Sequence, residues 1–172
     1  MAPPNGSAAQ APRRPRARKA APAPAAVEQV DTSFLETLLG YNTRRAWLVV
    51  SEVFQQRMAP FALRPVDLSV LSLVGRNPGI TSRQLCATLG ILPPNLVGLV
   101  SALEKRGLIS RSPHPHDGRA VGLHLTAEGA RLTGEAERTA SQLEADIANR
   151  LAPSEQRTLL RLLQKIYQRD GS

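Results

Sequence analysis

The sequence is poor in cysteine, in aromatic residues and in long apolar runs. Of its 172 residues one is a cysteine, Cys86, and 3% are aromatic. A single thiol cannot form an internal disulfide, and low cysteine use is typical of a reducing compartment. No apolar run approaches the roughly 18 residues that a membrane-spanning helix needs. We therefore expect a cytoplasmic protein that has no membrane partner.

Acidic residues are absent before Glu28, where proline, alanine and arginine dominate. This segment has almost nothing to bury, so residues 1–30 are predicted to form a disordered basic tail. The formal net charge of the chain is +8, and the tail supplies +5 of it. A further +3 lies between Thr81 and Arg119, where five basic residues meet two acidic ones. Such an excess indicates a polyanionic partner such as nucleic acid.

Catalytic arrangements are missing as well. No serine or cysteine stands with a histidine and an acid at a credible spacing, and no glycine-rich loop could cradle a phosphate. No helix face carries paired carboxylates that could frame a cleft. The chain is therefore not expected to be an enzyme, and no cofactor is predicted.

Hydrophobic periodicity predicts a mainly α fold with one small β-hairpin. The expected helices occupy residues 33–58, 64–79, 81–90, 91–107, 127–150 and 153–167, and the expected hairpin arms are 108–112 and 120–126. Ser33 and Glu36 match a capping box at the start of the first helix, and Thr81 and Gln84 match another at the start of the third.

The helix expected at 91–107 has two different faces. One is an apolar stripe at i, i+3, i+4 and i+7, which predicts burial of Leu96, Leu99, Val100 and Leu103. The opposite face holds small or short side chains, namely Pro94, Val97, Gly98, Ser101, Ala102 and Lys105. A smooth face without acids suits close approach to base edges. The alternative is an ordinary buried helix in a small α-domain.

The order of the elements is that of a winged helix-turn-helix, whose second helix enters the DNA major groove. In the second hairpin arm, Val121, Leu123 and Leu125 are expected to alternate inward. The segment "PHPHDG" forms the hairpin tip, and Arg119 is expected to reach from it into the narrow minor groove.

The tip also permits a metal hypothesis, because all three histidines of the chain lie in "HPHDGRAVGLHLT". His114, His116 and His124 could bind zinc together with Asp117. This ligand set is incomplete without a residue from another loop, so we favour contact of the wing with DNA and predict no metal.

Two motifs resemble the MarR (multiple antibiotic resistance regulator) family. "DGRAVGLHLT" resembles the wing signature D-x-R-x-x-x-L-x-L-T, and "PPNLVGLVSALEKRGLISR" resembles the recognition helix with its trailing L-E-x-R-G-L-I. The resemblance covers about residues 33–168. It implies a winged helix-turn-helix at about 63–126, flanked by N- and C-terminal dimerisation helices at about 33–58 and 127–169.

The resemblance also implies which residues contact DNA. Asp117 and Arg119 match the wing pair of the family. Many members carry arginine or threonine where this chain has Val97 and Gly98, so direct base readout is expected to be thin. The full set of candidate DNA-binding residues is Thr81, Ser82, Arg83, Gln84, Pro93, Pro94, Asn95, Val97, Gly98, Ser101, Lys105, Arg111, His116, Asp117 and Arg119.

The sequence therefore predicts a DNA-binding transcriptional regulator, specifically a homodimeric repressor on a pseudo-palindromic operator. Family members often respond to a small aromatic or anionic effector. Asn42, Arg45 and Trp47 of the first long helix are the candidate ligand contacts; alternatively, Asn42 pairs across the dimer and Arg45 is solvated.

Two other functions stay open. The winged-helix dimer could be a platform for protein interactions, in which case its binding to random duplex DNA would be indifferent to salt. It could also be a redox- or metal-responsive regulator acting through Cys86 or through His114 and His116. Buried thiols are usually inert, and the sequence has no second cysteine to resolve a sulfenate.

Overall fold

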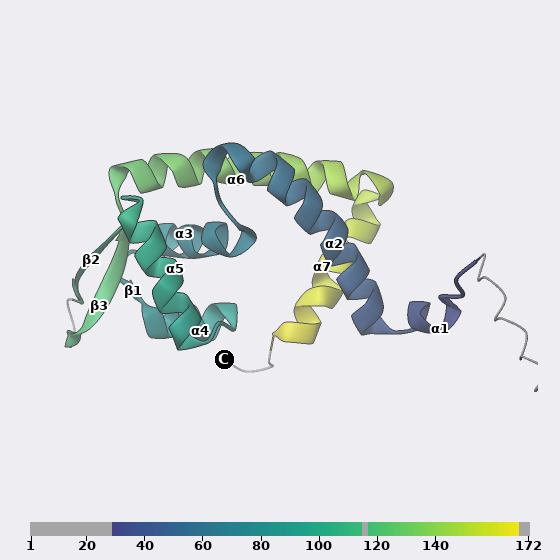
Figure 1. The fold of residues 1–172 in the computed structure, drawn as a ribbon, viewed down its shortest axis with the longest axis horizontal. Coiled ribbons are helices and arrows are strands. Elements are labelled where there is room, and N and C mark those ends of the chain that lie inside the picture. The colour runs from purple at the N-terminus through teal and green to yellow at the C-terminus, as the bar shows by residue number, and fades with distance from the viewer. Residues whose placement is uncertain (1–28, 115–116, 169–172) are drawn as a thin grey trace, which may run out of the picture.

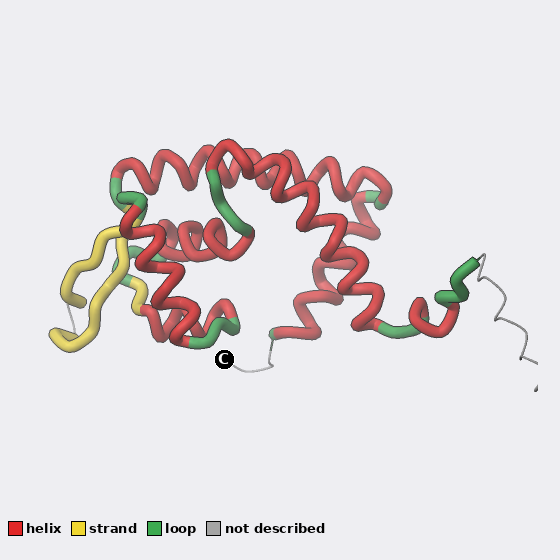
Figure 2. The backbone as a smooth tube through the Cα atoms, viewed as in Figure 1, coloured by secondary structure: helices red, strands yellow, loops and turns green. Residues whose placement is uncertain are grey.

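The computed structural model describes residues 29–114 and 117–168, apart from the side chains of residues 114, 117–120 and 148. The predicted basic tail therefore lies almost wholly outside the described residues. Helices make up most of the described chain, and the strands gather at one end of the molecule (Figure 2). The prediction of a mainly α fold with a small β wing is confirmed.

The chain forms seven α-helices, two 3-10 turns and three strands within the described residues. In order these are α1 (Ser33–Glu36), α2 (Leu39–Met58), η1 (Ala59–Phe61), α3 (Pro65–Arg76), β1 (Ile80–Thr81), α4 (Ser82–Leu89), α5 (Pro93–Lys105), β2 (Ile109–His114), β3 (Asp117–Leu125), α6 (Ala127–Ile147), η2 (Ala148–Arg150) and α7 (Pro153–Tyr167). Helix α6 runs along one side, with α3, α4, α5 and the sheet below one half of it (Figure 1). Helices α2 and α7 extend from its other half.

The predicted continuous helix over residues 33–58 is wrong, because the chain breaks between α1 and α2. Leu38 is extended, with φ −90° and ψ 126°. The side-chain amide of Asn42 stabilises this break by donating to the carbonyls of Glu36 at 2.7 Å and Leu38 at 2.9 Å. The sequence did not indicate this break, because the apolar stripe continues across it.

The Ser33–Glu36 capping box is also wrong. The Glu36 carboxylate accepts from the Thr32 hydroxyl at 2.5 Å, and the Ser33 amide donates to the carboxylate of Asp31 at 2.9 Å. The Thr81–Gln84 box, by contrast, is confirmed. The backbone amide of Gln84 donates to Thr81 Oγ1 at 3.3 Å, and the side-chain oxygen Gln84 Oε1 accepts from the backbone amide of Thr81 at 2.9 Å.

A third strand that the sequence did not predict joins the hairpin. The antiparallel sheet has the order β1-β3-β2, with Ile80 opposite Leu123 and Ile109 opposite Leu125. Glycine suits position 122 in this pairing, because a Cβ there would lie 3.0 Å from the backbone of Gly79, closer than ordinary van der Waals contact.

The alternation predicted for β3 holds only in part. Leu123 is buried and Leu125 is half-buried, but Val121 is 46% exposed. The reason is that the short β1 pairs only as far as Gly122, so the core does not extend under the outer part of the hairpin.

One hydrophobic core joins the winged unit to the long helices. The stripe of α5, with Leu96, Leu99, Val100 and Leu103, is buried as predicted. It belongs to the same cluster as Met58 of α2 and Leu143 of α6. This continuity fixes the orientation of α5 relative to the rest of the chain.

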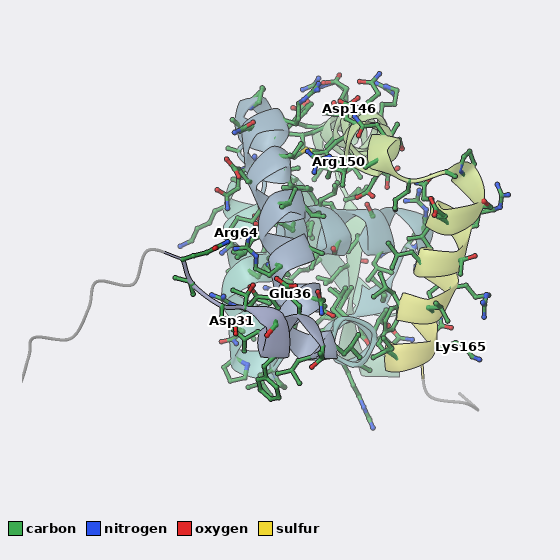
Figure 3. The ribbon with its side chains drawn as sticks, turned by 90° about the vertical axis from the view of Figure 1, so that its right-hand side faces the viewer. Asp31, Glu36, Arg64, Asp146, Arg150 and Lys165 are labelled. Atoms are coloured by element: carbon green, nitrogen blue, oxygen red, sulfur yellow. The ribbon has the colours of Figure 1, made fainter. Side chains whose placement is uncertain are left out.

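Other apolar side chains remain uncovered in the single chain. Helix α7 has no buried residue and stands apart from α2, with Lys165 near its end (Figure 3). The exposed set on α1, α2 and α7 includes Phe34, Leu39, Trp47, Val49, Leu159, Leu160, Leu162, Ile166 and Tyr167. Within the described ranges, no single helix combines the length and hydrophobicity that crossing a membrane requires.

Candidate nucleic-acid interface

The face of α5 opposite its buried stripe is open to solvent. Asn95, Val97, Gly98 and Lys105 are exposed, and Ser101 is half-buried. A Cβ added at Gly98 would meet no other atom within 4 Å. The alternative of a helix buried on all sides is therefore wrong, and a partner can approach the backbone of α5 closely here.

The entry to α5 adds an apolar contribution to this surface. Pro93 and Pro94 occupy the first turn, where the missing amide protons cost nothing, and both are exposed. Leu92, the residue before them, is 69% exposed. Sequence reasoning missed Leu92, because it lies outside the helical periodicity on which that reasoning depended.

Helix α4 supports α5 and presents fewer free groups than predicted. The side chains of Thr81 and Gln84 are engaged with each other in the capping box. Ser82 is half-buried, whereas Arg83 is exposed in the first turn. Of the four candidates on this helix, Arg83 has the side chain best suited to contact a phosphate.

The base of the hairpin holds an ion pair with α5. Arg111 Nε of β2 donates to Glu104 Oε2 at 3.0 Å. This pair neutralises the only acidic side chain of α5 and ties the strand to the helix. Arg111 is therefore a neighbour of the interface that is already partnered within the chain.

At the tip of the hairpin, residues 114 and 117–120 are described as backbone, and residues 115–116 lie outside the described residues. Asp117 and Arg119 belong to β3, and Asp117 lies opposite His114 after a register shift at Pro113/His114. His116 lies outside the described residues, as do the side chains of Asp117 and Arg119. The predicted contacts of these three residues stay predictions.

The metal hypothesis gains no support in the part of the chain that the structure describes. No group of three or more histidine, cysteine or acidic side chains there could hold a metal ion. His124 is half-buried, and its ring lies 3.7 Å from the position of a Cβ on Gly79. Cys86 is half-buried against the core.

A guanidinium group that sequence reasoning missed connects α5 to the junction between α2 and α3. Arg106, directly after α5, donates from Nη1 to the carbonyl of Ala62 at 2.8 Å and from Nη2 to that of Phe61 at 2.7 Å. Ala62 is held in the left-handed region, with φ 49°. The end of the recognition helix is thereby attached to the turn that leads from the long arm into the winged unit.

The same junction contains a buried charge. Asp67 is 6% exposed and accepts from the Arg64 backbone at 2.8 Å and from its guanidinium at 2.9 and 2.8 Å. Burial alone would raise the pKa of Asp67. The hydrogen bonds from Arg64 and the positive charges of Arg64 and Arg106 outweigh burial and hold that pKa below its ordinary value.

The candidate ligand contacts are spread along α2. The Asn42 amide nitrogen already donates to two backbone carbonyls, while Arg45 and Trp47 are exposed. A separate groove lies between α3 and α6, lined by Leu68, Ser72, Leu73, Arg76, Gly134, Glu137, Arg138, Ala140 and Ser141. Sequence reasoning could not find this groove, because it combines two helices that are distant along the chain.

Within this groove, Arg76 forms an ion pair with Glu137. The hydrogen bond from Arg76 is the main reason why the pKa of Glu137 lies below its ordinary value. Arg138 is exposed at the edge of the groove.

Comparison with known proteins identifies the family. A family model described as the MarR family matches residues 63–120. The transcriptional repressor CouR, in a structure bound to a 23-mer DNA duplex, is 37% identical with a TM-score of 0.77. The match covers 82% of this chain and 100% of that chain. The chain belongs to the MarR family.

Further relatives of this MarR-family chain are also transcriptional repressors or proteins whose DNA binding is regulated. A second CouR structure, bound to p-coumaroyl-CoA, matches at 37% identity and a TM-score of 0.71, covering 80% of this chain and 97% of that one. BpsR of Bordetella bronchiseptica, whose DNA binding is regulated by 6-hydroxynicotinic acid, matches at 26% identity and a TM-score of 0.72 over 77% and 95% of the two chains. An HTH-type transcriptional repressor of Mycobacterium tuberculosis is 27% identical over 74% of this chain and 92% of its own length.

The MarR-family chain is thus a DNA-binding transcriptional regulator and not an enzyme. The family resemblance predicted from the wing and recognition-helix motifs is confirmed.

Proposed function

We propose that this chain is a homodimeric repressor that binds a pseudo-palindromic operator and leaves it when a small aromatic or anionic ligand binds. The observation that carries the proposal is the open face of α5. This face is free of unpaired acids, and it lies on the winged unit next to a two-stranded hairpin. The helix fits the major groove, and the hairpin fits the adjacent minor groove.

The proposed division of the chain is the one that the family resemblance implies. Residues 63–126 form the DNA-binding module, and residues 33–58 and 127–169 form the dimerisation helices. The exposed apolar side chains of α1, α2 and α7 support the second assignment, because large apolar side chains gathered on exposed helices usually mark a surface that a partner covers. A two-fold dimer presents two α5 helices to half-sites about one helical turn apart. The protein would act where the DNA is, in the cytoplasm.

The ligand response is supported by the effectors of two relatives. CouR binds p-coumaroyl-CoA, and BpsR responds to 6-hydroxynicotinic acid. Both molecules combine an aromatic ring with an anionic group. The groove between α3 and α6 joins an apolar floor, including Leu68 and Leu73, to the exposed guanidinium of Arg138. We propose two candidate regions for sensing the ligand, namely this groove and, separately, Arg45 and Trp47 on α2.

The proposal is tested by selecting duplexes bound by the full-length protein from a random pool and then measuring affinity at several salt concentrations. We expect affinity to fall steeply with salt, because each neutralised phosphate contributes about −0.9 to the log–log slope. The same assay with added aryl carboxylates and aryl-CoA thioesters measures release. Affinity that ignores salt would favour a protein-docking platform instead.

The wing contact has its own test. We expect Arg119→Ala to weaken binding to the selected duplex by about 1–3 kcal/mol while the dimer stays folded. Arg161→Ala on α7, which removes the same charge far from the wing, is the control and is expected to bind normally. Equal binding by wild type and Arg119→Ala would remove the wing from the mechanism.

A further inference from the structure

A branched hydrocarbon side chain is exposed on the groove-facing surface of α5. Val97 is 59% exposed, although valine is a residue that soluble proteins usually bury. It lies between Pro94 and Ser101 at helical spacing, so it faces the same side as the candidate DNA contacts. The core does not use this side chain, which leaves it available for a partner.

The neighbours of Val97 let it approach a base edge directly. Gly98 has no side chain and open space around it, and Pro94 and Ala102 offer no side-chain hydrogen bonds. No long side chain stands beside Val97 on this face to hold the duplex away. A valine in a helix is also restricted to essentially one side-chain rotamer, so its two methyl groups are fixed before binding.

The major groove offers one apolar group to such a surface. Each base pair presents hydrogen-bond donors and acceptors there, and only thymine adds a methyl group, at C5. A side chain without donors or acceptors cannot satisfy the polar edges of the other bases. It gains free energy by excluding water from a methyl group.

We propose that Val97 reads a thymine 5-methyl group in each half-site of the operator. This inference rests on the proposed function, since it assumes that α5 lies in the major groove. It replaces the sequence-based expectation of thin base readout with a specific apolar contact. Ser101, one helical turn from Val97 on the same face, offers the hydroxyl whose hydrogen bond positions it.

The experiment removes the thymine methyl group and the two methyl groups of Val97 in turn. A duplex selected by the full-length protein is resynthesised with deoxyuridine in place of symmetric pairs of thymidines, one pair at a time. Wild type is expected to lose about fourfold in affinity per methyl group and about fifteenfold per symmetric pair, at one pair of positions. Val97→Ala is expected to bind the thymine duplex about as weakly as wild type binds the deoxyuridine duplex. Its affinity should fall little further when deoxyuridine replaces thymidine.

Two features keep this test specific. Deoxyuridine also alters the flexibility of DNA, but that effect is the same for both proteins and cancels in the comparison. Alanine has a higher helix propensity than valine, so Val97→Ala is expected to fold, with an unchanged or higher thermal midpoint. Val121→Ala, on the 46% exposed valine of the wing, is the matched control and should keep the full loss on deoxyuridine, because thymine methyl groups lie in the major groove.

The outcomes separate this inference from the proposed function. Wild type that binds a selected duplex but tolerates deoxyuridine at every position overturns the reading by Val97 and leaves the repressor intact. The reading by Val97 is likewise overturned if Val97→Ala loses as much affinity on deoxyuridine as wild type does. If no duplex is enriched at all, the proposed function fails, and the reading of thymine fails with it.

Discussion

At the scale of single residues, Asp67 is the buried charge on which the junction of α2 and α3 depends. Its carboxylate accepts three hydrogen bonds from Arg64 and lies in the first turn of α3. A negative charge there also interacts favourably with the helix dipole. Because both partners are close in sequence, this pair fixes how α3 begins rather than how distant parts of the chain meet.

We expect Asp67→Asn to lower the free energy of unfolding at neutral pH by about 1–2 kcal/mol, since a buried charge-assisted pair loses its charge. The folded pKa of Asp67 lies below its ordinary value of 3.8. The ionised Asp67 carboxylate therefore contributes to the free energy of unfolding above pH 3.8. This contribution is lost as the pH falls from 3.8 through the pKa of Asp67 in the folded protein. Urea unfolding of both proteins from pH 7 down to pH 3 should show the difference shrinking at the acidic end.

Glu128→Gln is the control for this prediction. Glu128 also pairs with an arginine three residues away, Arg131, but both side chains are more than half exposed. Exposed pairs contribute little to stability, so this substitution should leave the unfolding midpoint nearly unchanged. A gap between Asp67→Asn and wild type that persists unchanged at pH 3 would contradict the assigned role of the charge.

At the scale of elements, the recognition helix is held along its buried face and at its C-terminal end. Leu96 and its stripe bury one face, Arg111 ties the side of α5 to β2 through Glu104, and Arg106 ties its end to η1. The turn at Ala62 is strained for a residue with a Cβ, and the two hydrogen bonds from Arg106 stabilise it. The orientation of α5 therefore depends on the position of α2.

We expect Arg106→Ala to lower the free energy of unfolding by about 1 kcal/mol, because the carbonyls of Phe61 and Ala62 lose their charged donor. Binding to the selected duplex should weaken as well, since α5 is less firmly oriented. The slope of log affinity against log salt should stay unchanged, because Arg106 is engaged with the protein and not with a phosphate. Urea unfolding and a salt titration measure the two quantities.

Lys105→Ala provides the matched comparison at the adjacent position. Its side chain is exposed on the groove-facing side of α5. We expect its removal to leave stability unchanged and to reduce the salt slope by about 0.9, one phosphate contact. If Arg106→Ala instead reduced the salt slope and left stability unchanged, Arg106 would contact DNA and would not orient the helix.

These elements also show what sequence can and cannot predict. Helix α5, its buried stripe and the cap at Thr81 depend on residues within a few positions of each other, so local patterns predicted them. Strand β1 is two residues long and is stabilised only by pairing with the distant β3. The contact of Arg106 with Phe61 likewise depends on tertiary packing, and the break before α2 is set by Asn42 within an uninterrupted apolar pattern.

At the scale of the whole molecule, the single chain leaves its long helices partly uncovered. Its hydrophobic core extends from α5 through α3 to α2 and α6 and does not include α7. The apolar face of α7 combines Leu159, Leu162 and Ile166, each between 46% and 60% exposed. Such a face is stabilised when a second copy covers it, and the second copy also supplies the second α5 for the operator.

We therefore expect Ile166→Glu to dissociate the dimer, because a buried unpaired charge at an interface is strongly unfavourable. Gln164→Glu adds the same charge on the other side of α7 and should remain dimeric. Sedimentation measures the oligomeric state, and binding to the full operator should fall to that of a single half-site.

Because the free monomer could unfold, the thermal midpoint of wild type is measured over a hundredfold range of concentration, where a dimer must show a rising midpoint. A wild-type protein that sediments as a monomer with a constant midpoint would disprove the dimer. A monomer presents one α5, so an operator with two half-sites would then have no structural explanation.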